Sequence, residues 1–128
     1  MKRDTAKLLL HPRTGERLVV LREVTDPAGD SFRFELHTSV VTDPPGDHVH
    51  VAQWERIEVL AGTLRARVAG RERVLRAGAV ITIPPGTPHA IWNVDPGETR
   101  TIGEFRPALD MQQRMEERFR VAAAGGGR

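Results

Sequence analysis

The chain of 128 residues contains no cysteine, so neither a disulfide framework nor a metal site with thiolate ligands can form. This absence fits a reducing compartment, and we expect the protein to be cytoplasmic. The sequence also lacks a long apolar run, since the longest stretch near its start is Leu8-Leu9-Leu10. Such a run is far too short for a signal peptide or a membrane span, so we expect no membrane association.

A large excess of one charge is missing as well. The chain has 19 basic and 17 acidic residues, for a formal net charge of +2. The arginines are scattered among glutamates, which is typical of a solvated surface and gives no reason to propose a nucleic-acid partner. The length is that of one ordinary domain, and we expect a single domain over residues 1–128 with a core of about 17–106.

Short segments that alternate between apolar and polar residues dominate the first four fifths of the chain. Residues 31–37 place Phe32, Phe34 and Leu36 on one face of a strand. Leu8-Leu9-Leu10 is predicted to add an edge strand or to cover one end of the fold, and Ala61-Gly62-Thr63 to form a hairpin connection. Further strands are expected over residues 17–24, 55–60, 64–68, 73–75, 79–83, 89–94 and 99–105. Short strands between glycine and proline turns favour an antiparallel sandwich or barrel.

The last segment has helical periodicity instead. Pro107 is suited to the first position of a helix, and we expect that helix over residues 107–122. It would lie on the sandwich or on a partner subunit. The three consecutive glycines that follow favour a flexible tail over residues 123–128. The predicted apolar stripe of the helix consists of Ala108, Met111, Met115, Phe119 and Ala122.

Three histidines and one carboxylate form a candidate metal site. His48 and His50 are two residues apart, so on a strand both side chains would point to the same face. Glu55 follows after a turn, and His89 follows a proline-rich turn. Imidazole and carboxylate ligands suit one divalent transition metal ion, such as iron, manganese, nickel, copper, cobalt or zinc.

The spacing of these residues resembles the two motifs of the cupin superfamily. The first motif is matched by His48, His50, Glu55 and Gly62, although Thr42 stands where the family has its opening glycine. The second motif is matched without a gap by Gly78, Pro84, Gly86, His89 and Asn93. The resemblance implies an all-β, cupin-type jelly-roll sandwich or barrel, here with a C-terminal α-helix. It also implies that His48, His50, Glu55 and His89 are the metal ligands, and that the protein forms a homodimer.

The predicted function is that of a metal-dependent oxygenase similar to the quercetin dioxygenase-like cupins. Glu55 would also act as a catalytic base. Two alternatives remain open: a non-catalytic module that binds a small molecule or a metal, and a metal-dependent isomerase or cyclase. The substrate is expected to be small and largely apolar or aromatic, because the predicted pocket wall consists of Phe32, Phe34, Leu36, Ile57, Val59, Leu64 and Ile91.

Several other polar and aromatic residues receive weaker predictions. Gln53 is a candidate for a ligand or for a hydrogen bond to one, and Asn93 for the support of a turn. Trp54 and Trp92 are expected to line the mouth of the pocket or to pack. The two remaining histidines, at positions 11 and 37, are expected to be surface or hydrogen-bonded residues.

Overall fold

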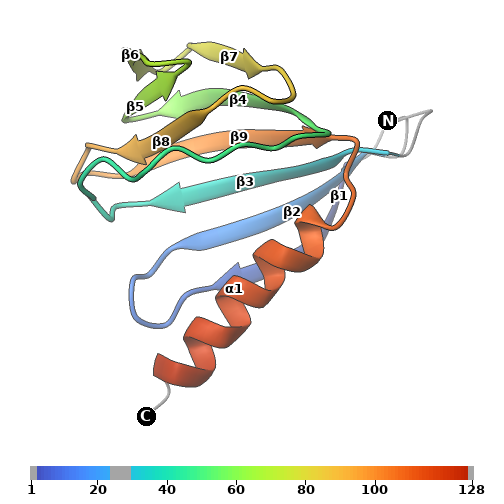
Figure 1. Ribbon diagram of the computed structural model, residues 1–128. Helices are drawn as coiled ribbons and strands as arrows, with labels where there is room; N and C mark the ends of the chain where they lie inside the picture. Colours follow the sequence, from blue (N-terminus) through green and yellow to red (C-terminus); the bar gives the residue numbers. More distant parts are fainter. Residues whose placement is uncertain (1–2, 24–29, 127–128) are drawn as a thin grey trace.

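The computed structural model describes residues 3–23 and 30–126, which form nine strands and one helix (Figure 1). The strands are β1 (Arg3–Leu10), β2 (Arg17–Glu23), β3 (Phe32–Thr38), β4 (Trp54–Ala61), β5 (Thr63–Val68), β6 (Arg71–Arg76), β7 (Val80–Ile83), β8 (His89–Asn93) and β9 (Thr99–Arg106). The helix is α1 (Met111–Gly126).

The strands form two antiparallel sheets. The larger sheet has six strands in the order β1-β2-β3-β9-β4-β7, and the smaller sheet has three in the order β6-β5-β8. The prediction of an all-β jelly-roll sandwich with a C-terminal helix is therefore confirmed. Of the two roles predicted for Leu8-Leu9-Leu10, the edge strand is observed, because among the described strands β1 pairs only with β2 at the end of the larger sheet.

Two hydrophobic clusters lie on opposite halves of the larger sheet. One fills the space between the two sheets and contains Ile57, Val59, Leu64, Ala66, Leu75, Ile81 and Ile83. The other lies where the larger sheet extends beyond the smaller one, and contains Leu18, Val20, Phe32, Phe34, Phe105, Met111 and Phe119. In this second cluster α1 covers the sheet of its own chain (Figure 1). Ala108, Met111, Met115 and Phe119 of the predicted stripe thus pack against the sandwich of the same chain, which is the first of the two predicted locations. The side chain of Ala122 lies outside the described part of the structure.

The predicted boundaries of the helix were wrong. Leu109 has a φ of 48°, a left-handed conformation that a right-handed helix cannot include, so the helix begins only at Met111. The carbonyl groups of Pro107 and Ala108 instead accept hydrogen bonds from Gln53 Nε2, at 2.9 and 3.0 Å. Residues 123–126 are helical where a flexible tail was expected, and consecutive alanines of high helix propensity lead into them. Residues 127–128 of that tail lie outside the described part of the chain.

The predicted hairpin at Gly62 is in fact a passage between sheets, because β4 belongs to the larger sheet and β5 to the smaller. Gly62 has a φ of 86°, and a Cβ atom there would lie 2.7 Å from Thr99 Cα. Only glycine suits both conditions. β6 begins at Arg71, two residues earlier than the strand predicted over residues 73–75, so only Ala69 and Gly70 form the turn after β5.

Candidate metal centre

The segment over residues 39–53, which we call the motif loop, carries the first two histidines. The two-residue spacing predicted a strand at His48, but this residue forms only an isolated bridge to His89. The bridge consists of two backbone hydrogen bonds, His48 N to His89 O at 2.8 Å and His89 N to His48 O at 3.0 Å. Gly86 N also donates to His50 O at 2.9 Å. These bonds hold both histidines beside His89 without a regular strand.

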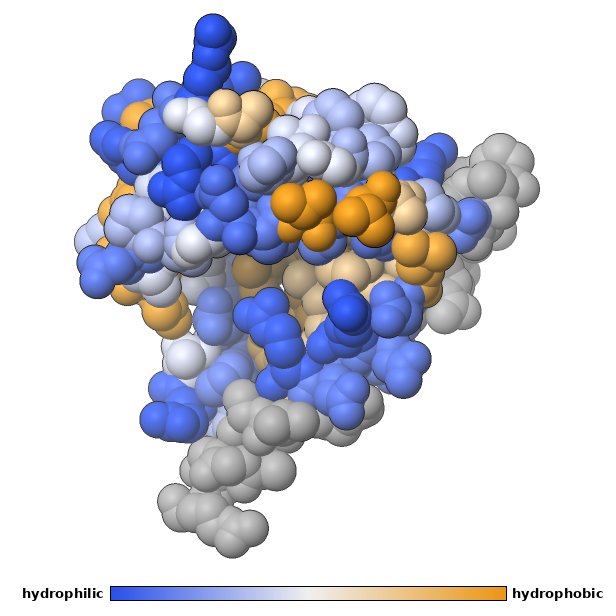
Figure 2. Space-filling model, viewed as in Figure 1, coloured by the Kyte–Doolittle hydropathy of each residue, from blue (hydrophilic) through white to orange (hydrophobic). Residues whose placement is uncertain are grey.

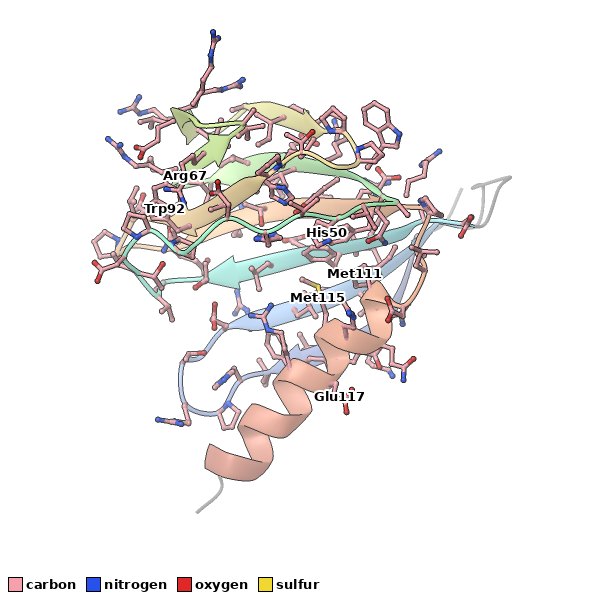
Figure 3. All side chains as sticks on the ribbon, viewed as in Figure 1. His50, Arg67, Trp92, Met111, Met115 and Glu117 are labelled. Carbon is pink, nitrogen blue, oxygen red and sulfur yellow. The ribbon has the colours of Figure 1, made fainter. Side chains whose placement is uncertain are left out.

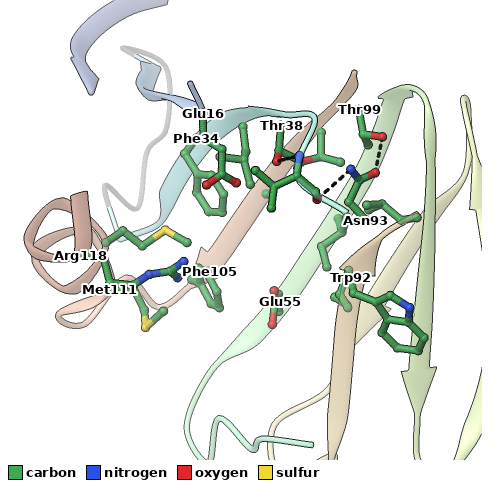
Figure 4. A pocket seen from close by; sticks show the side chains of 18 of the residues that line it. Glu16, Phe34, Thr38, Glu55, Trp92, Asn93, Thr99, Phe105, Met111 and Arg118 are labelled. Atoms are coloured by element: carbon green, nitrogen blue, oxygen red, sulfur yellow. Dashed lines mark hydrogen bonds between the residues drawn. The ribbon is translucent and has the colours of Figure 1, made fainter. Parts of the chain in front are cut away.

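The four predicted site residues come together. Each of His48, His50, Glu55 and His89 offers one ligand atom, and these atoms all lie within 4.8 Å of one another. Glu55 Oε1 accepts a hydrogen bond from His89 Nε2 at 2.9 Å and lies 3.6 Å from His50 Nε2. Figure 3 shows His50 between the strands and α1, and Figure 4 shows Glu55 on β4 facing the same space. The cluster could hold a metal ion, and its binding of one stays a prediction.

For two of the three histidines, burial favours the neutral state that a metal requires. Burial lowers the pKa of His48, as do the neighbouring His89 and His50. Burial likewise lowers the pKa of His50, where Glu55 acts in the opposite direction and His89 and Arg114 add to the decrease. Both imidazoles are therefore favoured in the neutral form that donates a lone pair to a metal.

The pKa of His89 shifts in the opposite direction. Its hydrogen bond to Glu55 raises its pKa against the effect of burial, and a second bond, from Nδ1 to Thr87 O at 2.9 Å, adds to the increase. The Thr87 carbonyl can only accept, so Nδ1 carries a proton and Nε2 faces Glu55 and the cluster. A metal ion would take the place of the proton between Nε2 and the carboxylate. Three imidazoles and one carboxylate thus fit a divalent transition metal.

A cavity of about 620 Å³ opens beside the cluster. Its wall includes Phe34, Leu36, Ile57, Leu64 and Ile91, as predicted. The other two predicted wall residues, Phe32 and Val59, lie in the two hydrophobic clusters instead. In Figure 2 apolar side chains line a hollow above the hydrophilic surface of α1. A cavity of this size and character suits a small organic ligand.

Comparison with known proteins agrees with the motif spacing. The sequence profile described as Cupin domain matches residues 32–102, more than half of the chain. The chain belongs to the cupin family. No curated protein sequence matches this cupin.

Solved structures of similar fold are numerous. KdgF from a Halomonas species is 17% identical with a TM-score of 0.64, and the match covers 88% of this cupin and 91% of KdgF. An RmlC-like cupin from Shewanella frigidimarina is 18% identical with a TM-score of 0.63, covering 87% and 98% of the two chains. The structure named FeII HppE is 18% identical with a TM-score of 0.60, covering 77% of this cupin but only 55% of the other chain. At these identities the likeness concerns the fold alone.

Several residues that line the cavity of this cupin were missed from the sequence. Met111, Arg114, Met115 and Arg118 come from α1, and Glu16 comes from the turn before β2. The helical stripe had been interpreted only as packing against the sandwich or a partner. The available signal was the four-residue spacing of Arg114 and Arg118 beside Met111 and Met115, which places all four on adjoining faces of one helix.

Two of the weaker polar predictions are now decided. Gln53 is buried, and its Nε2 donates to the segment before α1, so it orients the helix. Asn93 supports its turn as predicted: its amide donates to Val40 O and Asp95 O, and its Oδ1 accepts from Thr99 Oγ1 at 2.6 Å.

The aromatic and histidine predictions are decided too. Trp92 lines the cavity, whereas Trp54 is 49% exposed and lies outside the lining. His11 accepts hydrogen bonds from two backbone amides, and His37 lies 2.8 Å from Glu35. Neither histidine belongs to the cluster.

Arg67 on β5 fixes the outer part of the motif loop. Its guanidinium donates to Asp47 Oδ1 at 2.8 Å and to Pro45 O at 2.7 Å, and it lies over the Trp92 ring at 5.6 Å from the centroid. Charge-assisted bonds of this kind hold a loop more firmly than neutral ones. The bond to Asp47 connects the residue before His48 to the smaller sheet. In this loop Thr42 replaces the glycine of the family motif.

Proposed function

We propose that this cupin is a metal-dependent oxygenase that acts on a small, largely apolar or aromatic organic substrate. The observation that carries the proposal is the position of the four-residue cluster. His48, His50 and Glu55 lie in the wall of the cavity, so an ion bound there would face the space that a substrate fills. Four protein ligands leave at least one position of a five- or six-coordinate ion for another molecule.

The residues around the cluster would position the substrate and exclude water. A redox-active metal at this site would supply the activation of an enol, diketone or diol toward oxygen. Phe34 and Phe105 present apolar surface to the same cavity, and Gly103 lies beside the Phe34 ring where a side chain would collide with it. Such a wall favours a flat or aromatic substrate body. The name FeII HppE, for a protein of the same fold, supports iron as one candidate metal.

Glu55 is proposed as the base. Its side chain is only 12% exposed, and its Oε1 is already hydrogen-bonded to His89. A carboxylate held in this way keeps its orientation while a second lone pair remains to accept a proton from a bound substrate. This role requires that Glu55 be ionised when substrate binds.

The test is to determine metal content by elemental analysis of the purified protein, followed by oxygen uptake with a panel of enols, diketones and catechols. We expect close to one redox-active ion per chain and uptake with at least one aromatic member. Chelation should abolish the uptake, and readdition of the same metal should restore it. Zinc with substrate conversion but no oxygen uptake would instead favour an isomerase or cyclase, and tight binding without turnover would favour a binding module.

We further propose a homodimer assembled through β1. This strand is an edge of the larger sheet, and Leu8 and Leu10 on it are 54% and 57% exposed. Exposed apolar edges favour pairing with another chain. Light scattering at micromolar concentration should give twice the 14.2 kDa mass of one chain. Replacing Leu8 and Leu10 with lysine should give the monomer mass, while Leu109→Lys, at an exposed residue away from the edge, should not. A monomeric parent would contradict the proposal.

A further inference from the structure

We propose that the ligand of this cavity carries a carboxylate, and that Arg114 and Arg118 of α1 bind that group at the cavity mouth. The inference rests on the proposed function in placing a small organic molecule beside the metal cluster, and it narrows the chemical class of that molecule. The body of the ligand would lie against the apolar wall, and its acidic end would face the helix.

The positions of the two arginines support this arrangement. Arg114 and Arg118 are four residues apart, so they project from the same side of α1 on successive turns. Both line the cavity, as do Met111 and Met115 of the same helix. Figure 4 shows Met111 and Arg118 at the helix across the cavity from Glu55.

Both guanidinium groups are free to engage a ligand. Arg114 forms an ion pair from Nε to Asp110 Oδ2 at 3.2 Å. The side chains of both residues in this pair are more than 60% exposed. A pair this exposed contributes little and is easily exchanged for another carboxylate. Arg118 is exposed and has no hydrogen bond or ion pair with any residue in the described part of the chain. By contrast, Arg67 is committed to Asp47 and Pro45.

The cavity lining offers only one acid outside the metal cluster to balance the charge at the mouth. Of the two acidic residues that line the cavity, Glu55 is hydrogen-bonded to His89 within the cluster. The other is Glu16, whose Oε1 accepts a hydrogen bond from Thr14 Oγ1 at 3.1 Å. The two arginines therefore face Glu16 in the lining and the exposed Asp110 that pairs with Arg114, and a divalent ion in the cluster would add positive charge. With that ion bound, the field at the mouth would attract anions.

A carboxylate fits these groups better than a phosphate or a neutral polar group does. Guanidinium forks bind planar carboxylates through two parallel hydrogen bonds. The rest of the wall is largely apolar, so the additional oxygens of a phosphate would remain without partners there. A neutral amide of the same shape would gain no charge-assisted bond. The ligand class is accordingly a small monocarboxylic acid with an apolar or aromatic body.

The experiment uses matched pairs of probes, such as cinnamate with cinnamamide and phenylacetate with phenylacetamide. Binding is measured by calorimetry on the metal-loaded full chain and on the same protein after chelation. The variants are Arg114→Gln with Arg118→Gln in one chain, and Arg71→Gln as the matched control. Arg71 is an exposed arginine on β6, outside the cavity lining.

We expect at least one acid to bind the parent about tenfold or more tightly than its amide, as charge-assisted hydrogen bonds predict. The double arginine variant should lose that preference in both metal states, while its affinity for the amide and its metal content stay unchanged. The Arg71→Gln control should retain the preference. Equal binding of every acid and amide would overturn the inference, as would a preference that survives in the double variant, since the metal alone would then recognise the acid.

The result is separable from that of the proposed function. A protein without bound metal or oxygen uptake, in which the arginine pair still selects acids, would refute the oxygenase and leave this inference intact. A metal-loaded protein that consumes oxygen but binds each acid and its amide equally would support the oxygenase and refute this inference.

Discussion

His50→Ala should abolish stable metal binding and turnover while leaving the fold intact. The substitution removes one of four clustered ligand atoms, and we expect metal affinity to fall by more than about 100-fold, since even residues that only support a ligand cost 10- to 100-fold. His50 lies on the motif loop, outside both hydrophobic clusters. In the absence of metal, parent and variant should therefore have unfolding free energies within about 1 kcal/mol of each other.

The measurement combines elemental analysis with thermal melting, each with and without added metal. The parent should gain stability from the metal, by about 2.7 kcal/mol when free metal is 100 times its dissociation constant, and the variant should gain almost none. His11→Ala is the matched control, because that histidine lies outside the cluster. If His50→Ala retained full metal content, the assignment of the ligand set would be wrong.

Val59→Asp, unlike His50→Ala, should prevent folding. Val59 is 1% exposed, at the centre of the cluster between the two sheets. A carboxylate there would be buried without a partner, which costs several kcal/mol in addition to the lost packing. Because a domain of this size is stable by only about 5–15 kcal/mol, most of the folded population should be lost. Val59 is a better choice than Ile57, because Ile57 also lines the cavity.

Circular dichroism and thermal melting of the metal-free proteins provide the test. Val80→Asp is the control, since Val80 lies on β7 of the same sheet but is 43% exposed. It should melt close to the parent, whereas Val59→Asp should show no cooperative transition. If Val59→Asp melted like the control, the assignment of Val59 to the hydrophobic core would be wrong.

The sequence was most informative where spacing is constrained by chemistry. The four residues of the cluster were predicted because their two motifs have fixed intervals, and they do lie together. The alternation of Phe32, Phe34 and Leu36 likewise predicted β3 to within one residue at each end, because the side chains of a strand point to opposite faces in turn. Local rules of this kind need no knowledge of distant contacts.

The errors arose where a distant contact decides the local conformation. Gly62 was interpreted as a hairpin turn, but Thr99, far along the chain, closes the space beside it and the chain passes to the other sheet. The start of α1 was set too early, because the turn at Leu109 and the bonds from Gln53 are not visible in the helical periodicity. Arg114 and Arg118 were missed for the same reason: their location beside a cavity depends on how the helix packs.

The motif loop has one further consequence, for how the ion would be captured. Outside the bridge at His48 it has no regular structure. Six of its residues are nevertheless hydrogen-bonded to Arg67 on β5, to Gly86 in the turn before β8, or to His89 and Asn93 on β8. The donor atoms consequently converge before any ion arrives. Binding should need little ordering of the chain, so that most of the coordination energy is retained as affinity. The geometry of the metal cluster therefore depends on the residues that hold the motif loop, namely Arg67, Gly86, His89 and Asn93. These residues should stay unchanged in any redesign of the metal preference.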